Sequence, residues 1–351
     1  MKLLLVGAGT PTSTRDVENG YAAAFRELGV DVKLYALEAR LTVAHHWLHT
    51  QWRARGKRPE DRPSWADVLY RASVEALEMA LRFEVDWVFV VSAMYLHPDT
   101  LELMYRAGLR VAVLFTESPY EDLPQLRIAQ RVDWCWTNER SSARTLRGGY
   151  LAHAYDPAKH SLTPPDLGTP AHDVVFVGTG FVERLELLGA VDWSGVDLGL
   201  YGEWGLLGSR HRLRQYVRGQ VIDNAAAIAL YRRAKIGLNL FRTSSTYGKQ
   251  VRHHTGALSA NPRTFELAAC GLFQLSQHRA EVEAIFGPSV PTFSTAQELE
   301  RLVHHALEDD AARESCAVLA RELVAPHTYA ARAAQALADL EQLEAAQTKG
   351  A

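Results

Sequence analysis

The sequence predicts an α/β protein with two Rossmann-like domains facing a central cleft, followed by a C-terminal helical tail. Short apolar runs alternate with amphipathic helical stretches, a pattern typical of βαβ units and parallel sheets. The alternation stops at a proline-rich segment and then starts again, which indicates a second domain of the same kind. A chain of 351 residues also has the length expected of two domains.

The composition is that of a globular protein, with 47% apolar residues, 23% charged residues and a formal net charge of -3. These proportions exclude disordered, collagen-like and coiled-coil proteins. Cys135, Cys270 and Cys316 are far apart in the chain, so neither a disulfide framework nor a zinc site is expected. No apolar run is long enough for a membrane helix, and the first run ends at Val6, too early for a signal peptide. We expect a soluble cytoplasmic protein.

The first half contains the expected strands of a parallel sheet, because several apolar runs are continuous, as in strands buried on both faces. These runs are residues 3–6, 30–35, 86–91, 109–115 and 132–137. Helical stretches separate them, and Ser64 is the expected N-cap of the longest one. The expected helices are residues 17–28, 64–83, 97–107 and 139–146.

Residues 156–172 are rich in proline and glycine and form the expected linker. This linker separates an N-terminal domain, 1–155, from a second domain, 173–325, and a helix over 326–351 is expected to cross back to the first domain. The expected strands of the second domain are residues 173–177, 196–201, 235–240 and 272–276. The expected helices are residues 181–188, 224–234, 262–270 and 280–286, followed by a helical region from about residue 295.

A glycine turn, Gly7-Ala8-Gly9-Thr10, follows the first strand. The complete GxGxxG pattern is absent because Thr12 stands at the third glycine position. Tyr35 stands where the acidic residue of an NAD site would end the second strand. We therefore interpret this turn as the lining of an acceptor cleft, and a dehydrogenase is the weaker alternative.

A second glycine turn, Gly178-Thr179-Gly180, opens the second domain. Glycines let backbone N–H groups approach phosphate oxygens, and the helix that follows adds a partial positive charge. Arg184 lies about one turn into that helix, from where its guanidinium could reach a diphosphate. A purely structural turn with a surface arginine is the alternative interpretation.

The segment from Asn261 to Gly271 predicts a helix with a buried face and two charged residues near its start. Arg263 and Glu266 are three positions apart, so they share one side of the helix. They could form a surface salt bridge. They could instead bind a ligand, the carboxylate accepting hydrogen bonds from a ribose diol and the guanidinium contacting a phosphate.

Taken in order along the chain, these pieces resemble the CgeB-like (spore maturation protein) glycosyltransferases, which have the GT-B architecture. Glu117 stands where an aspartate is usual in that family. The segments that carry the resemblance are FTESP at 115–119, HAYDP at 153–157, DVVFVG at 173–178 with Arg184, LYG at 200–202 with Trp204, YRRAKIGLN at 231–239 with Arg242, and RTFE at 263–266 with ACG at 269–271.

The resemblance implies a nucleotide-sugar donor, UDP- or GDP-linked, with no metal and no other cofactor. Glu266 would hold the ribose hydroxyls, and Arg184 and Arg263 would neutralise the diphosphate together with the Gly178–Gly180 turn. Tyr201 and Trp204 would border the base. Many retaining GT-B enzymes have a second glutamate where this chain has Leu258, so the stereochemical course stays open.

The acceptor side carries a weaker pattern. Glu117 and Asp16 follow strand ends of the first domain and are the candidate catalytic bases of an inverting enzyme. Other polar residues at these strand ends are Ser13, Thr14, Arg15 and Tyr120. The acceptor could be a protein, a glycan, a lipid, a small metabolite or modified nucleic acid.

Two basic segments have alternative interpretations. One is a long loop that contains a basic cluster of Lys249, Arg252, His253 and His254. This loop is either solvated or closes over a phosphate. The stretch from Arg53 to Arg62 is either an exposed loop or a contact for an anionic acceptor.

Two further alternatives to a glycosyltransferase share its fold. A GT-B-shaped sugar-nucleotide epimerase would alter the donor sugar without any acceptor. A non-catalytic binding protein would hold the nucleotide sugar and leave it unchanged. Fold resemblance alone does not separate these functions.

Overall fold

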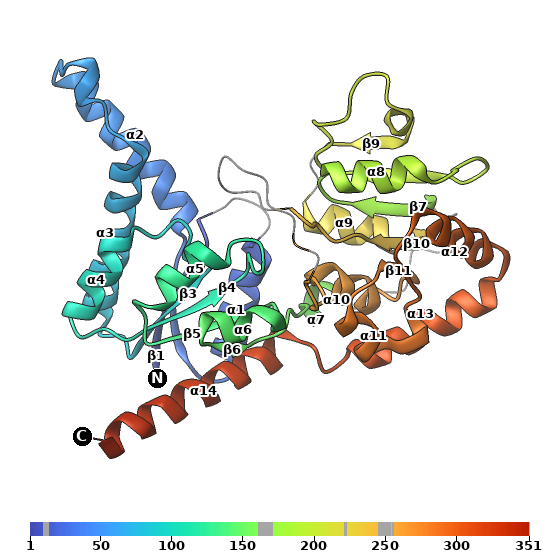
Figure 1. The fold of residues 1–351 in the computed structure, drawn as a ribbon. Helices are drawn as coiled ribbons and strands as arrows, with labels where there is room; N and C mark the ends of the chain where they lie inside the picture. The colour runs from blue at the N-terminus through green and yellow to red at the C-terminus, as the bar shows by residue number, and fades with distance from the viewer. Residues whose placement is uncertain (10–13, 161–170, 221–222, 245–253, 255, 351) are drawn as a thin grey trace. The chain divides into compact units, whose positions relative to one another are not determined.

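The structure is a computed structural model, and it describes residues 1–9, 14–160, 171–220, 223–244, 254 and 256–350. The chain divides into two compact units (Figure 1). Unit 1 is Met1–Ala152 together with Tyr329–Ala351, and unit 2 is His153–Thr328. The linker expected at 156–172 falls in unit 2, and its residues 161–170 lie outside the described part of the chain.

Unit 1 contains a six-stranded parallel sheet in the order β2-β1-β3-β4-β5-β6. The order reverses between β1 and β3, and open α/β sheets bind ligands at the carboxyl ends of strands beside such a switch point. The strands are β1 (Lys2–Val6), β2 (Asp31–Tyr35), β3 (Trp87–Val91), β4 (Val111–Phe115), β5 (Trp134–Thr137) and β6 (Gly149–Tyr150). The helices are α1 (Arg15–Glu27), α2 (Leu37–Ala54), α3 (Trp65–Phe83), α4 (Pro98–Arg106), α5 (Asp122–Ala129), α6 (Arg140–Leu146) and α14 (Tyr329–Gly350).

The last helix, α14, packs in unit 1 although the rest of that unit is N-terminal. Its Tyr329 ring contacts Tyr21 edge-on at 5.4 Å between centroids. Two fully buried tryptophans of the sheet donate their indole N–H to carboxylates of α14: Trp87 to Glu344 and Trp136 to Asp339, each at 2.7 Å. Since a buried indole N–H needs an acceptor, α14 satisfies the polar groups of the sheet that it covers.

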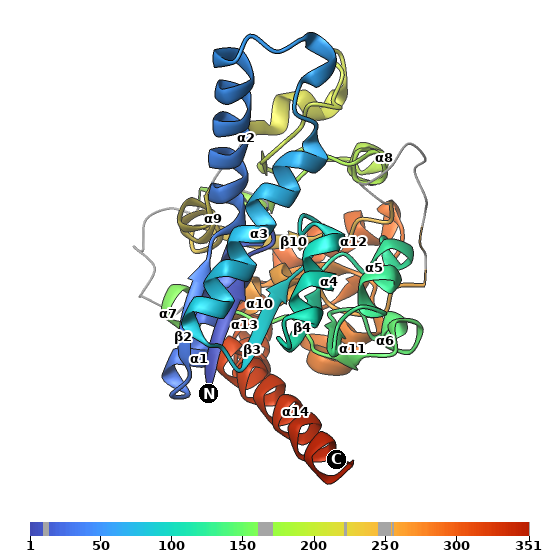
Figure 2. The ribbon, with the colours of Figure 1, turned by 90° about the vertical axis from the view of Figure 1, so that its left-hand side faces the viewer.

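Helices α2 and α3 lie side by side and extend away from the sheet (Figures 1 and 2). The base of this pair is buried, with Ala44 as the last buried residue of α2 and Val68 as the first of α3. Between them no residue is buried, and Trp47 and Trp65 are about half exposed. Ser64 caps α3 through a complete capping box with Asp67, as its sequence predicts.

Unit 2 contains a second six-stranded parallel sheet, in the Rossmann order β12-β11-β10-β7-β8-β9. Its switch point lies between β7 and β10. The strands are β7 (His172–Val177), β8 (Leu198–Tyr201), β9 (Val217–Gly219), β10 (Ala234–Asn239), β11 (Gln274–Gln277) and β12 (Thr292–Phe293). The helices are α7 (Pro157–His160), α8 (Val182–Ala190), α9 (Asn224–Tyr231), α10 (Pro262–Ala269), α11 (Ala280–Phe286), α12 (Ala296–Glu308) and α13 (Asp310–Val324).

The predicted strands and helices are confirmed with ends that differ by a few residues. Helices α2, α5 and α7 and the edge strands β6, β9 and β12 were not predicted. Helix α2 has no sustained apolar face, because its outer half contacts little besides α3 and the turn that joins them. Strands β6 and β9 have two and three residues, too short for an alternating pattern.

Candidate functional site

The glycine turn after β7 lies against three side chains that leave little room for a larger residue. A Cβ at Gly178 would lie 3.0 Å from the Phe176 ring and 3.4 Å from Nη1 of Arg263. A Cβ at Gly180 would lie 2.5 Å from the Trp204 ring. Glycine therefore allows these side chains to approach the turn closely, and the approach of a phosphate, for which the sequence analysis gave these glycines, stays a prediction.

Arg263 stands in the first turn of α10 and reaches the turn after β7. Its Nε donates a hydrogen bond to the Tyr231 hydroxyl at 3.2 Å, and its guanidinium lies 5.5 Å from the centre of the Phe176 ring. Burial lowers the pKa of Arg263, but Tyr231 and Glu266 outweigh this and hold that pKa above its ordinary value. The structure thus brings a charged guanidinium to Gly178, beside the switch point of unit 2.

Glu266 lies one turn further along α10 and is partly buried. Among the residues that the structure describes, no donor forms a hydrogen bond with its carboxylate. Its charge is near Arg263, and it helps to raise the pKa of the buried Cys270 thiol to about 12. Arg263 and Glu266 are therefore neighbours without a direct ion pair, and the oxygens of Glu266 can still accept hydrogen bonds.

Arg184 is buried rather than exposed, which differs from the surface arginine of the alternative interpretation. Its Nη1 donates to the Thr179 carbonyl at 2.9 Å and its Nη2 to the Leu240 carbonyl at 2.7 Å. The guanidinium lies 5.3 Å from the Phe176 ring and 5.1 Å from the Phe181 ring. Arg184 thereby joins the turn after β7 to the end of β10, across the switch point.

A buried amide network fixes the start of α10. The Asn261 side chain accepts from the backbone N–H of Thr264 at 3.1 Å and from its hydroxyl at 2.9 Å. Asn239 at the end of β10 donates to the Thr264 hydroxyl at 2.7 Å and to Ser276 at 3.0 Å. Sequence reasoning missed these residues, although polar residues in otherwise apolar strands were the available signal.

Trp204 borders a cavity of about 620 Å³ at the carboxyl ends of β8 and β9. Trp204 is 4% exposed, and its buried indole N–H has no hydrogen-bond partner among the described residues. The lining residues are Glu203, Trp204, Gly205, Leu207, Arg214, Val217, Arg218, Gly219 and Gln220. The cavity is large enough for a nucleobase, and Trp204 is the aromatic residue among those that line it.

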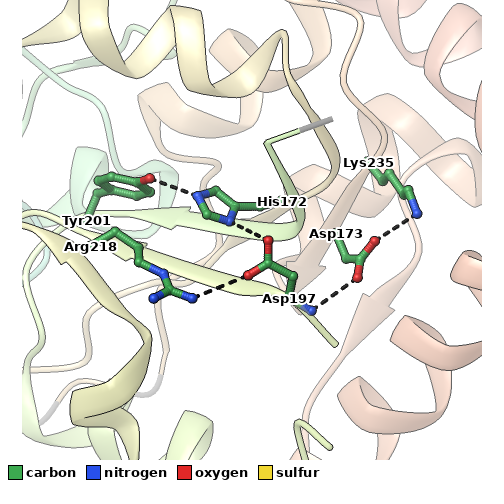
Figure 3. Close-up of polar contacts among 6 residues, drawn as sticks. All are labelled: His172, Asp173, Asp197, Tyr201, Arg218 and Lys235. Carbon is green, nitrogen blue, oxygen red and sulfur yellow. Dashed lines mark hydrogen bonds and ion pairs between the residues drawn. The ribbon is translucent and has the colours of Figure 1, made fainter. Parts of the chain in front are cut away.

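Tyr201 contributes differently, because its hydroxyl is bonded within the protein (Figure 3). The hydroxyl lies 2.8 Å from Nε2 of His172, whose Nδ1 lies 2.9 Å from Asp197. Asp197 also pairs with Arg218 at 3.4 Å. The pKa of Tyr201 is raised mainly by burial. This chain of contacts fixes the Tyr201 ring along the sheet and connects it with Arg218, which lines the cavity.

In unit 1, Glu117 follows β4 and is buried. Its Oε1 accepts from the Ser92 hydroxyl at 2.5 Å, and its Oε2 accepts from Gln125 at 3.1 Å. Ser92 and Ala93, which follow β3, have left-handed φ angles of 70° and 61°. Such residues require support from their surroundings. Oε1 of Glu117 thus holds the turn after β3, and Oε2 holds Gln125 of α5.

The other residues predicted near the acceptor are placed as follows. Asp16 is partly buried in the first turn of α1. Arg15, its neighbour, pairs with Glu38 at 2.7 Å. Ser13 and Lys249, with Arg252 and His253, lie outside the described residues.

The first glycine turn of the chain already holds an anion of the protein itself. Glu18 of α1 accepts from the backbone N–H of Ala8 at 2.6 Å, and a Cβ at Gly7 would lie 2.5 Å from its carboxylate. Burial raises the pKa of Glu18 despite that hydrogen bond. The carboxylate occupies the place where a dinucleotide phosphate would lie, which disfavours an NAD site in unit 1.

No group of three or more His, Cys, Asp or Glu side chains is placed to hold a metal ion among the described residues. In the same part of the chain, no helix is both long and apolar enough to cross a membrane.

A family model described as "Glycosyl transferase-like" matches residues 180–338. The fold is that of solved GT-B proteins. Sucrose-phosphate synthase from Thermosynechococcus elongatus has a TM-score of 0.68 at 13% identity, covering 98% of this chain and 99% of the other. Anabaena HepE, in complex with UDP-glucose, has a TM-score of 0.61 at 14% identity, covering 97% of this chain and 100% of the other. A glycosyltransferase from Rickettsia africae has a TM-score of 0.62 at 11% identity, covering 97% of this chain and 98% of the other.

A search of curated proteins gave no significant match. Each of the two units contains a six-stranded parallel sheet, and a C-terminal helix follows them. This architecture is the GT-B class of fold. The family model covers less than half of the chain, and the solved structures show its fold.

Proposed function

We propose that the protein transfers a sugar from a UDP- or GDP-linked donor to an acceptor hydroxyl, as a CgeB-like GT-B glycosyltransferase. The observation that carries this proposal is the approach of the Arg263 guanidinium to Gly178, at the switch point of unit 2. A cation beside a glycine turn at the start of a helix suits a diphosphate, because the guanidinium and the helix N-terminus both supply positive potential there. The N–H groups of Gly178 and Gly180 donate to the Tyr201 and Glu203 carbonyls, so they hold the turn itself.

Each donor group then has a proposed partner. The diphosphate lies on the Gly178-Thr179-Gly180 turn and is neutralised by Arg263, with the charge of Arg184 behind the turn. The ribose hydroxyls donate to Glu266, whose carboxylate has free acceptor positions among the described residues. The base occupies the cavity that Trp204 borders, and the contacts of Tyr201 keep its wall in place.

The reaction forms a bond between the acceptor oxygen and the anomeric carbon, and breaks the bond from that carbon to the diphosphate. The diphosphate leaves with the electron pair, so negative charge grows on it in the transition state. Arg263 stabilises that charge more strongly as it develops, which lowers the barrier. This step needs no group beyond the side chains named here and the two substrates.

The proton of the acceptor hydroxyl passes to a base of unit 1 in an inverting reaction. Asp16 and Glu117 are the proposed candidates. The contacts of Glu117 with Ser92 and Gln125 favour Asp16 for this role. Glu117 then acts by positioning the turn after β3.

A thermal-shift screen against UDP, GDP, ADP, TDP and CMP, their sugar conjugates and NAD tests the donor site. A nucleoside diphosphate and its sugar should raise the Tm of the native protein by mass action. The same sugar nucleotide is then incubated with the enzyme, and released diphosphate and altered sugars are measured. A changed sugar on an intact nucleotide would identify the epimerase instead, and a shift with NAD alone would overturn the donor site.

A further inference from the structure

A second arginine of unit 2 is buried without a partner for its charge. Arg279 follows β11 and precedes α11, at the carboxyl edge of the sheet, and it is 8% exposed. Its guanidinium lies 4.4 Å from the centre of the Phe241 ring, which follows β10. One hydrogen bond is formed, from Nη1 to the adjacent His278 carbonyl at 3.4 Å.

The remaining donors of Arg279 are unsatisfied. Among the described residues, its Nε and Nη2 are buried and have no acceptor, and no carboxylate lies within 4.0 Å of the guanidinium. Arg184 is equally buried, but two carbonyls accept from it at 2.9 and 2.7 Å. A buried cation without a counter-charge is costly, so such a group is expected to have a ligand.

The nearby polar groups are committed elsewhere. The Glu281 carboxylate accepts from the backbone N–H of Ala260 at 2.8 Å. The Gln277 carbonyl oxygen accepts from the backbone N–H of Phe241 at 3.1 Å. Neither oxygen is within hydrogen-bond distance of Arg279 in the described structure. Phe241 offers a cation–π contact, which compensates for only part of the lost hydration.

We propose that Arg279 is the cationic residue of an anion-binding site at the carboxyl ends of β10 and β11. The ligand is an oxyanion, a phosphate or a carboxylate, because the planar guanidinium fork binds both in a bidentate manner. The site is separate from that of Arg263, which lies beside β7 on the other side of β10. The assignment of this oxyanion to the sugar nucleotide rests on the proposed function; the site itself does not.

The first test uses the stability of the ligand-free protein. Arg279→Met replaces an unpaired buried charge by an apolar chain of similar length, so its Tm should equal or exceed that of the wild type. If Arg279 instead stabilised the fold, Arg279→Met would have a lower Tm than the wild type. Arg301→Met is the matched control, because Arg301 is exposed on α12 of the same unit. A fall of several degrees confined to Arg279→Met would overturn the proposal.

The second test measures the response to anions at constant ionic strength. Inorganic phosphate, UDP, UDP-glucose and UDP-glucuronate are the probes, with chloride as the reference salt. An anion at a hundred times its Kd should raise the wild-type Tm by about 5–10 °C. The shift with inorganic phosphate should be lost in Arg279→Met, retained in part in Arg279→Lys and retained fully in Arg301→Met. A sugar nucleotide also contacts Arg263 and Glu266 under the proposed function, so it should keep part of its shift in Arg279→Met.

The outcomes distinguish the ligand and separate the two proposals. A shift with UDP that depends on Arg279 identifies a phosphate, and one restricted to UDP-glucuronate identifies a carboxylate. A Tm shift with inorganic phosphate, together with no Tm shift with any sugar nucleotide, would support the Arg279 site. The same result would contradict the proposed function, because no sugar-nucleotide donor would bind. Equal shifts in the wild type and Arg279→Met, or no shift with any of the four anions, would overturn the Arg279 site.

Discussion

Arg184 and Leu240 are joined across the switch point of unit 2 by a hydrogen bond of 2.7 Å from Nη2 to the carbonyl oxygen. The two residues are 56 positions apart, and they connect α8 to the end of β10. The same guanidinium also donates to the Thr179 carbonyl, so one side chain joins the glycine turn to the end of β10. This relationship gives the first of four predictions.

Arg184→Met should destabilise unit 2, because two buried carbonyls lose their donor. We expect a loss of about 2–4 kcal/mol in the free energy of unfolding, measured by urea denaturation. Arg301→Met, at an exposed position, should change this free energy by less than about 0.5 kcal/mol. An Arg184→Met protein as stable as the wild type would show that the clamp does not stabilise the fold.

Glu266→Ala should weaken nucleotide binding by about 1–3 kcal/mol, because the ribose hydroxyls lose their acceptor. Stability should change little, since no donor among the described residues bonds to this carboxylate. Isothermal titration calorimetry with the nucleotide found by the thermal screen gives the Kd. Glu314→Ala, at an exposed position of α13, is the control. If the two variants bind nucleotide with the same affinity, Glu266 does not hold the ribose.

Arg263→Ala should lower turnover more than it weakens donor binding. Its contact with the diphosphate strengthens as charge develops on the leaving group, so the transition state loses more than the ground state. Release of the nucleoside diphosphate and the donor Kd are measured on the same preparation. An increase in Kd with unchanged turnover at saturating donor would contradict this role.

Glu18 predicts a pH dependence of stability with a definite sign. Its pKa is raised in the folded state, mainly by burial, so the folded protein binds the proton more tightly than the unfolded chain. The stabilising contribution of the protonated carboxyl is therefore present at low pH and decreases as pH rises above the unfolded value of 4.5.

Glu18→Gln removes this titration while keeping an oxygen acceptor for the Ala8 N–H. The Tm of the variant relative to the wild type should therefore increase from pH 4 to pH 7. Differential scanning calorimetry at several pH values measures this difference, and other titrating groups cancel between the two proteins. A difference that is constant with pH would refute the assignment.

The sequence predicted the alternating elements of both sheets because their signals are local. Continuous apolar runs mark β3 and β4, and the cap at Ser64 marks the start of α3. Helix α2 was missed because its outer half has no buried face to impose a periodicity. Propensity alone is a weak guide where tertiary contacts do not select the residues.

The candidate site was predicted in part for the same reason. The glycines at Gly178 and Gly180 and the pair Arg263 and Glu266 are recognisable from spacing within one turn or helix. The burial of Arg184 and of Arg279 depends on carbonyls and rings contributed from distant positions, as in the contact with Leu240. No spacing rule links such partners before the fold is known.

The division of the chain has a consequence for its synthesis. The chain leaves unit 1 after Ala152 and returns to it at Tyr329, and the backbone N–H of Tyr155 bonds to the His327 carbonyl at 3.1 Å where the two passages meet. A ribosome therefore releases all of unit 2 before the carboxylates that accept from Trp87 and Trp136 emerge. Unit 2 therefore emerges before α14, and unit 1 gains the carboxylate acceptors of Trp87 and Trp136 only after unit 2 has been synthesised.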